Sequence, residues 1–388
     1  MSDLEQILSL WRELETAGGD YVLATIVAVE GSNYRRPGAR MLLAADGRRA
    51  GTVSGGCLEA EVARRAWWLT EDGPAVERYS TVDDDGDMPY GSGCGGVIYI
   101  LLERRATASV SLAALDRAFE ARRPLAIATI IEGPHIGERA MIPVADAPTG
   151  QDDDDSARLL ASWRIDLGRA AHSALEGRHS GEDRIPIDGE MVRVWAEYRF
   201  PRTGLWIFGA GDDAGPLLQF ARELGWFVAI ADGRAHLATE SRFPAAQQVT
   251  TLNISDLPQT APAELDLRDA DAAVMMTHSF EQDARILALF LSRSPERRPA
   301  YIGVLGPQHR TRELLKEVAR LLGIVPSTEL VNRWLDEIHA PMGLDLGAEA
   351  PAPVALSILA EIHKALQRTS ALPLNVVRAY RLEAAHHG

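Results

Sequence analysis

The second half of the chain alternates short apolar runs with amphipathic stretches, and this alternation constrains the fold more than any other feature. The runs "GLWIF", "WFVAIAD", "AAVMMTH" and "AYIGVLG" are strand-length, and the stretches between them repeat apolar residues at helical spacing. Strands that alternate with helices are typical of a parallel sheet covered on both faces. We therefore predict a Rossmann-like, doubly wound α/β domain over residues 201–388.

A glycine-rich turn follows the first of these strands. Gly209 and Gly211 begin a G-x-G-x-x-A pattern, in which glycines allow a tight turn and close approach of a phosphate to the backbone. Asp232 ends the next strand, where a ribose-binding acid is expected. His278 follows a strand at the edge where such sheets bind ligands, although it could equally serve a loop hydrogen bond. These four residues are the candidate cofactor-binding residues of this half.

The first half, residues 1–200, reads as a mixed α+β domain. Strand-like stretches at 21–30, 40–46, 49–55 and 95–103 accompany a helical stretch at 57–70. Towards its end the chain becomes richer in Asp, Gly and Pro, which predicts an irregular connecting segment near 146–200. A chain of 388 residues is longer than one hydrophobic core usually organises, so we expect two domains.

Charge and apolar patterning exclude two classes of partner. The formal net charge is −15, which argues against nucleic-acid binding because that usually needs a basic surface. The longest dense apolar run, "VIYILLE", is far short of a membrane span, and the N-terminus lacks the pattern of a signal peptide. We therefore expect a cytoplasmic protein that binds neither nucleic acid nor membrane.

Both cysteines of the chain stand beside glycines. Cys57 follows "SGG" and precedes a helical stretch, and a thiol at a helix N-terminus has a lowered pKa. Cys94 lies in "GCGG", just before a strand. Two cysteines are too few for a disulfide framework or a thiolate zinc site. The alternative is that either one is a small packing residue.

Three arginines lie in the segment "GSNYRRPGAR". Arg35, Arg36 and Arg40 precede and begin an apolar strand-like stretch. The planar guanidinium suits a phosphate or a planar polar heterocycle. Exposed charge on the approach to a hairpin is the alternative interpretation.

The order of these motifs resembles the XdhC/CoxI family, accessory proteins for the maturation of xanthine dehydrogenase and related molybdenum hydroxylases. The resemblance covers roughly residues 15–105 and 203–365. The segments that carry it are "GSNYRRPGARMLLAADGRRAGTVSGGCLEAEV", "GCGGVIYILLE", "IFGAGDDAG", "ADGR", "MMTHSFEQD", "YIGVLG" and "PMGLDLGAEAPAPVALSILAEI". This chain departs from the family pattern at Asn33 and Tyr34, and at Asp212, where the family has a histidine.

The resemblance implies a molybdenum-cofactor chaperone. Such a protein binds the cofactor, as molybdopterin or its dinucleotide form, protects it while a cysteine desulfurase adds sulfur, and delivers it to an apo-hydroxylase. Cys57 matches the family's "SGGC" cysteine and would contact molybdenum or sulfur, a soft partner suited to a thiolate. The expected cofactor-binding residues of the first half are Arg35, Arg36, Arg40, Ser54, Gly55, Gly56, Cys57 and Cys94. We expect a homodimer that acts as a carrier, with no catalytic residues.

Two other functions stay open. The glycine turn and Asp232 also suit an NAD(P)-dependent oxidoreductase, although Asp212 and Asp213 would repel a pyrophosphate. The third interpretation is a maturation adaptor that binds no small molecule.

Overall fold

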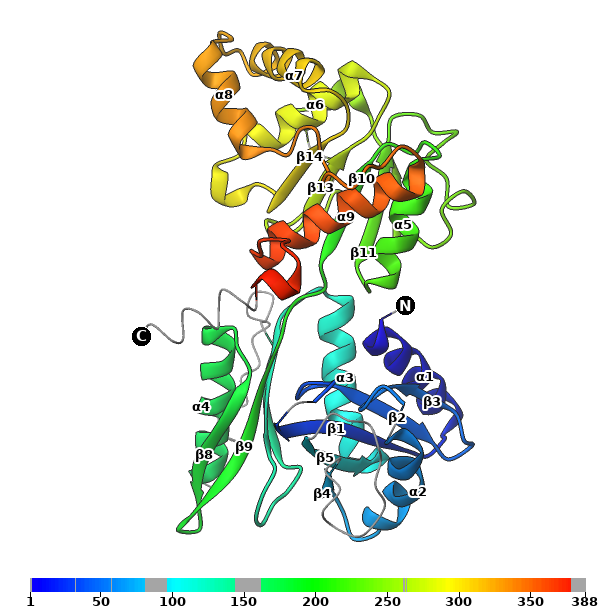
Figure 1. The fold of residues 1–388 in the computed structure, drawn as a ribbon, viewed down its shortest axis with the longest axis vertical. Helices are drawn as coiled ribbons and strands as arrows, with labels where there is room; N and C mark the ends of the chain where they lie inside the picture. Colours follow the sequence, from blue (N-terminus) through cyan, green and yellow to red (C-terminus); the bar gives the residue numbers. More distant parts are fainter. Residues whose placement is uncertain are drawn as a thin grey trace. The chain divides into compact units, whose positions relative to one another are not determined.

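The computed structural model describes residues 2–31, 33–56, 58–80, 96–143, 162–260, 262 and 264–377. The chain divides into two compact units, Met1–Arg202 and Thr203–Gly388, which are described one at a time (Figure 1). No helix in the described part of the chain is long and apolar enough to cross a membrane.

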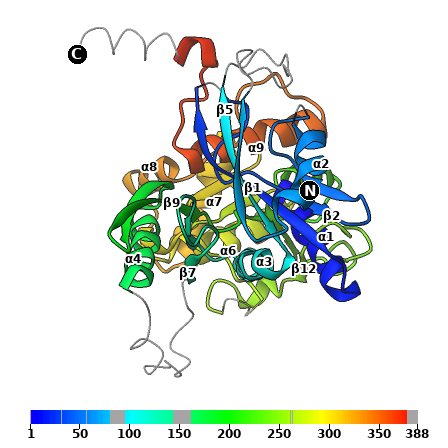
Figure 2. The ribbon, with the colours of Figure 1, turned by 90° about the horizontal axis from the view of Figure 1, so that it is seen from below.

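The first unit contains an antiparallel five-stranded sheet in the order β3-β2-β1-β5-β4. Its strands are β1 (Tyr21–Glu30), β2 (Arg40–Ala44), β3 (Arg49–Gly51), β4 (Ala75–Ser80) and β5 (Val97–Arg104). The long strands β1 and β5 lie side by side at its centre (Figure 2). Side chains alternate along β1, so that Tyr21 and Leu23 face one core cluster while Val22 and Ala24 face another.

Three helices cover the two faces of this sheet. They are α1 (Asp3–Ala17), α2 (Glu59–Leu69) and α3 (Arg105–Glu120). The Ser2 hydroxyl accepts the Glu5 N–H at 3.3 Å and so caps α1. Helices α1 and α3 pack on the face that includes Leu23, and α2 packs on the face that includes Val22.

A second sheet and its helix complete this unit. The strands β6 (Leu125–Ile130), β7 (Arg139–Pro143), β8 (Gly181–Ile187) and β9 (Glu190–Arg199) form it in the order β7-β6-β9-β8. Helix α4 (Ser162–Gly177) packs against β8 and β9 (Figure 1). Trp195 on β9 packs with Val27 and Leu101 of the first sheet.

The prediction of an irregular connecting segment near 146–200 is wrong for residues 162–200, where α4, β8 and β9 build a core of their own. The pattern misleads because α4 buries mainly alanines, including Ala170, Ala171 and Ala174, whose apolar signal is weak. Strand β8 lies at the sheet edge and exposes most of its residues, so it reads as polar. Residues 144–161 lie outside the described part.

The second unit confirms the Rossmann-like prediction. Its strands are β10 (Gly204–Phe208), β11 (Phe227–Asp232), β12 (Gln248–Thr251), β13 (Ala272–Met275) and β14 (Tyr301–Val304). They pair in parallel in the order β12-β11-β10-β13-β14, which matches the order of the first five strands of the Rossmann fold.

Helices cover both faces of this sheet, as a doubly wound fold requires. They are α5 (Ala214–Glu223), α6 (Phe280–Leu291), α7 (Gln308–Leu321), α8 (Thr328–Glu337) and α9 (Pro351–Gln367), with short 3-10 turns at Ile254–Asp256 and Pro295–Arg297. Leu205 and Ile207 on β10 face α5 and α9, whereas Trp206 and Phe208 face α6, α7 and α8. The layers that position the glycine turn are therefore those that the apolar pattern predicts.

Candidate functional site

The glycine-rich loop before α2 is organised around one carboxylate. Oε1 of Glu59 accepts the backbone N–H groups of Val53, Ser54 and Gly55 at 3.1, 2.8 and 3.1 Å. Oε2 accepts the Gly56 N–H at 2.8 Å and the Ser54 hydroxyl at 2.6 Å. Successive backbone N–H groups that converge in this way form an anion-binding nest, and here the first residue of α2 occupies it.

These hydrogen bonds keep Glu59 ionised. The side chain is buried, and burial alone would raise its pKa, but the hydrogen bonds from Ser54 and the backbone outweigh burial and lower the pKa to about 2. The Ser54 hydroxyl also accepts the Leu58 N–H at 2.8 Å, which ties the loop to the start of the helix. These hydrogen bonds therefore fix the conformation of the loop.

The loop amides that precede Cys57 in sequence already have a hydrogen-bond partner. The amides of residues 53–56 are all engaged by Glu59, which carries a negative charge at the start of α2. These four amides are thus not free to stabilise a thiolate. Cys57 and Cys94 themselves lie outside the described residues, and their roles stay predictions.

The loop of residues 31–39 contacts the glycine-rich loop. A Cβ placed on Gly55 would lie 2.9 Å from both Cδ1 and Cε1 of Tyr34, so the phenol ring lies directly against the Gly55 backbone. Gly55 has a φ of +86°, a conformation that favours glycine. The same loop is tied to β5, because Asn33 Nδ2 donates to the carbonyl oxygens of Glu30 at 2.8 Å and Val97 at 3.3 Å. The structure therefore brings together the arginine-containing segment, the "SGG" loop and the start of the strand that follows "GCGG".

The three predicted arginines lie in different environments. Arg35 pairs with Asp3 of α1. Arg40 is buried and pairs with Glu197 of β9, with Nη1 and Oε1 2.9 Å apart, and its Nη1 also donates to the Gly38 carbonyl at 2.9 Å. Arg36 is exposed and makes no ion pair within the described part of the chain. Arg36 is therefore the arginine that is available to an anionic ligand.

The Arg40–Glu197 pair belongs to a buried set of charges between the two sheets of the first unit. Burial would lower the pKa of Arg40, but Glu197 outweighs it and raises that pKa. Burial would raise the pKa of Glu197, but Arg40 outweighs it and lowers that pKa, so both groups are charged. Glu103 pairs with Arg139 nearby, and burial raises the pKa of Glu103. Arg40 thus connects the sheets, a role that its position in a strand-like stretch did not predict.

In the second unit, the glycine turn has the geometry that its sequence predicts. Gly209 has a φ of +132°, and a Cβ there would lie 2.7 Å from the Met276 carbonyl oxygen. A Cβ on Gly211 would lie 3.9 Å from Nε2 of His278, which is exposed. The turn therefore places both glycines and His278 at the carboxyl edge of the sheet.

The predicted ribose-binding acid is already engaged. Oδ2 of Asp232 accepts the Ala210 N–H at 2.7 Å and Arg234 Nη2 at 2.7 Å. Its Oδ1 accepts the backbone N–H and Nε of Arg234 at 2.9 and 3.0 Å. Burial opposes ionisation of Asp232, but the bonds from Arg234 and Ala210 lower its pKa. A ribose hydroxyl would have to displace Arg234 to reach this carboxylate.

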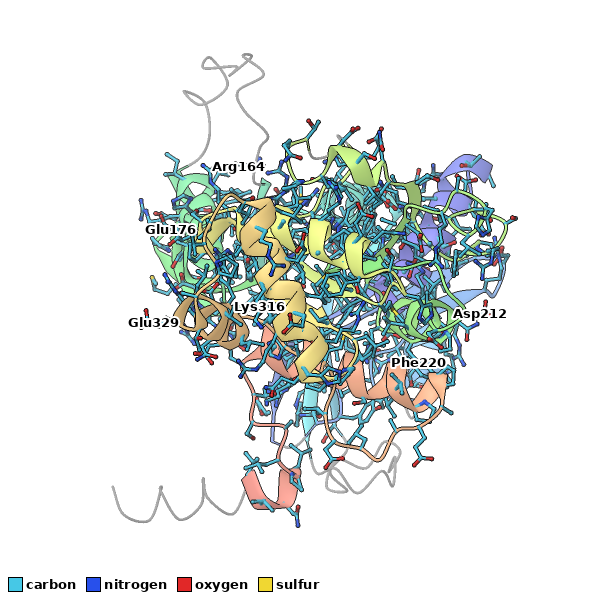
Figure 3. All side chains as sticks on the ribbon, turned by 90° about the horizontal axis from the view of Figure 1, so that it is seen from above. Arg164, Glu176, Asp212, Phe220, Lys316 and Glu329 are labelled. Atoms are coloured by element: carbon cyan, nitrogen blue, oxygen red, sulfur yellow. The ribbon has the colours of Figure 1, made fainter. Side chains whose placement is uncertain are left out.

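Two further aspartates at this edge also pair with arginines. Asp212 lies exposed at the surface and pairs with Arg242 at 2.8 Å (Figure 3). Asp283 on α6 accepts from the Thr277 hydroxyl at 2.6 Å and pairs with Arg310 at 2.7 Å, so these groups, and not His278, are its partners. Arg242 and Arg310 are therefore already paired with carboxylates and do not offer a free cation to a pyrophosphate.

Glu59 and Tyr34 are site residues that no sequence pattern indicated. Glu59 stands five positions after Ser54, which is not the spacing of a capping box, so no standard helix-start pattern indicates its role.

Within the ranges described, no group of three or more His, Cys, Asp or Glu side chains is placed to hold a metal ion.

The fold and the loop define a class of protein in which an α+β unit with a glycine-rich loop precedes a Rossmann unit. Two family models match the chain, the XdhC and CoxI family over residues 14–80 and the XdhC Rossmann domain over residues 205–362. The chain belongs to the XdhC and CoxI family, which confirms the resemblance.

Similar proteins cover almost the whole chain. A Bacillus subtilis protein, named as a probable xanthine dehydrogenase subunit, is 30% identical over 90% of this chain and 94% of its own length. The Escherichia coli molybdenum cofactor insertion chaperone PaoD is 26% identical over 93% of this chain and 88% of its own length. A crystal structure of a Bacillus halodurans protein described as a xanthine dehydrogenase has a TM-score of 0.67 and 27% identity, over 96% of this chain and 97% of that one.

Proposed function

We propose that this chain binds molybdenum cofactor in its first unit, supports its sulfuration by a cysteine desulfurase, and delivers it to a hydroxylase of the xanthine dehydrogenase kind. It acts as a carrier with no catalytic residue of its own. We further propose that it works in the cytoplasm as a homodimer.

The convergence of three segments in the first unit carries this proposal. Tyr34 contacts Gly55 of the "SGG" loop, and Asn33 binds the Val97 carbonyl at the start of β5. The exposed Arg36 lies in the same loop and provides a cation for an anionic ligand. In sequence, Cys57 follows directly on the organised loop and Cys94 precedes Val97 by three positions.

The names of two relatives support the same conclusion. One relative is named a molybdenum cofactor insertion chaperone, and the other is named as part of a probable xanthine dehydrogenase. Both align over about nine tenths of this chain.

The geometry of the second unit does not favour the alternative of an NAD(P)-dependent oxidoreductase. Both oxygens of Asp232 are occupied by Arg234 and Ala210, and Arg242, the cation beside the turn, is paired with Asp212. We propose that this unit does not carry out hydride transfer.

The test is to express the full chain in a host that makes the cofactor, purify it, and oxidise the bound ligand to its fluorescent pterin form. We expect pterin in the wild type and its loss in Cys57→Ala, with Cys94→Ala as the matched second thiol variant. Absence of pterin from the wild type, in a host with a proven supply, would favour the adaptor and overturn the carrier. Full pterin content in Cys57→Ala would remove that thiol from the site.

A further inference from the structure

We propose that Tyr34 is a stacking residue for the planar ring system of the ligand, and that it sets the preference of this loop for a flat heterocycle of the pterin class. This inference rests on the proposed function, because it concerns the same site. It adds Tyr34 to the proposed ligand-binding residues, and it adds aromatic stacking to the charge interactions expected from the arginines of the loop.

The first observation is the exposure of the ring. Tyr34 is 75% exposed, which makes it the most exposed Phe, Tyr or Trp among the residues that the structure describes. Phe200 follows at 71%, but its ring packs edge-on against Tyr198, and Trp68 on α2 is 64% exposed. An aromatic side chain gains most of its stabilisation from contact area, so exposure to this extent leaves a large flat surface available to a ligand.

The second observation is that the exposed ring contacts the glycine-rich loop on one side. It lies along its Cδ1–Cε1 side against the Gly55 backbone, so a side chain at position 55 would displace the ring. Gly55 is held in turn by the bond of its N–H to Glu59 at 3.1 Å. The ring therefore rests on a loop whose shape is fixed by hydrogen bonds, and a ligand that stacks on the ring does not have to order that loop.

The third observation is that the backbone of Tyr34 is anchored from its other side. The side chain of Asn33, the preceding residue, donates to the carbonyl groups of Glu30 and Val97. The residue before Tyr34 is thus tied to the end of β1 and the start of β5, while the ring itself contacts the "SGG" loop. The hydrogen bonds of Asn33 therefore restrict the backbone from which the Tyr34 ring projects.

Charge in the same loop completes the recognition chemistry. Arg36 is exposed two residues after Tyr34, whereas Arg35 pairs with Asp3. An exposed aromatic ring and an exposed guanidinium in one loop suit a ligand with a planar ring and a phosphate. The pterin ring would stack on Tyr34 while its anionic arm meets Arg36.

The experiment measures how fast the full-length protein, purified with its ligand, loses pterin on dilution and gel filtration. Tyr34→Leu keeps apolar bulk without a ring, and Tyr34→Phe keeps the ring without the hydroxyl. Stacking of an aromatic side chain on a planar base is worth roughly tenfold or more in affinity. We therefore expect about tenfold faster loss from Tyr34→Leu and retention close to wild type in Tyr34→Phe. Trp68→Leu, the matched exposed control, should leave retention unchanged.

The outcomes separate this inference from the function beneath it. If the wild type carries pterin and Tyr34→Leu retains it equally well, the stacking role is wrong and the carrier function stands. If Tyr34→Phe loses pterin as fast as Tyr34→Leu, the hydroxyl and not the ring is responsible, which also overturns stacking. If the wild type carries no pterin from a host that makes it, the proposed function itself fails. Thermal melting of each variant verifies that the exposed substitutions leave the fold intact.

Discussion

Ser54 gives Glu59 two hydrogen bonds at once, from its backbone N–H at 2.8 Å and from its hydroxyl at 2.6 Å. The loop before α2 therefore closes on a carboxylate of the same chain. A ligand that binds next to this loop meets a preformed surface of glycine backbone and does not have to order it.

Replacing Glu59 with Gln should destabilise the first unit by about 2 kcal/mol, because an amide accepts hydrogen bonds without charge and turns an N–H group towards the loop amides. We expect a lower midpoint in urea unfolding. Glu61→Gln on the same helix is the matched control, since Glu61 pairs with Arg64, whose side chain is 68% exposed, and such pairs contribute less than about 1 kcal/mol. Equal midpoints for the two variants would contradict the role of Glu59.

The contribution of Glu59 should depend on pH in a defined direction. Its pKa is lowered from 4.5 to about 2, so its ionised form stabilises the folded state fully above pH 4.5, and this stabilisation is lost as pH falls towards 2. The difference in unfolding free energy between wild type and Glu59→Gln should be constant from about pH 7 to about pH 5 and smaller at about pH 3. A difference that stays the same or grows at the acidic end would show that the charge is not responsible.

Replacing Glu197 with Gln should be more costly, at about 3–5 kcal/mol, because it leaves the buried guanidinium of Arg40 without its counter-charge. Thermal or urea unfolding measures this loss. Glu182→Gln tests a pair that is open to solvent, between Glu182 and Arg193, and should change stability by less than about 1 kcal/mol. Similar losses of unfolding free energy in both variants would mean that burial does not increase the contribution of the Arg40–Glu197 pair to stability.

Arg36→Ala should lower the retention of pterin about tenfold without changing the thermal midpoint, because Arg36 is exposed and a charge-assisted hydrogen bond to a ligand is worth about 1.5–3 kcal/mol. Arg169→Ala on α4 removes another exposed arginine and should have no effect on retention. The measurement is the pterin released per mole of each purified variant. Retention by Arg36→Ala at the wild-type level would assign the anionic arm to another group.

Although the partly exposed edge strand β12 was not predicted, the fold of the second unit was largely predictable because four of its strands, β10, β11, β13 and β14, are buried. Such strands are continuous apolar runs, and the intervening helices repeat apolar residues at their own period. The G-x-G turn at Gly209 was equally visible, because close contact with the Met276 carbonyl excludes any side chain there. The end of the first unit was less visible, since α4 buries small residues and β8 is an edge strand.

The candidate site was predictable only in part. The sequence identified the arginine segment and the "SGG" loop, but it did not separate the exposed Arg36 from the buried Arg40. That difference depends on Glu197, which lies far along the chain on β9. The sequence pattern also predicted that Asp232 binds a ribose, whereas in the tertiary structure this residue pairs with Arg234.

The sequence by itself determined the two kinds of unit, the glycine positions and the family, because these depend on local periodicity and on residues whose backbone conformation only glycine adopts readily. Only the tertiary structure decided which charges are neutralised and which are available, and that Tyr34 lies on Gly55 while Glu59 occupies the loop amides. The physical reason is that pairing and burial depend on which segments meet in space. One-dimensional patterns do not contain that information.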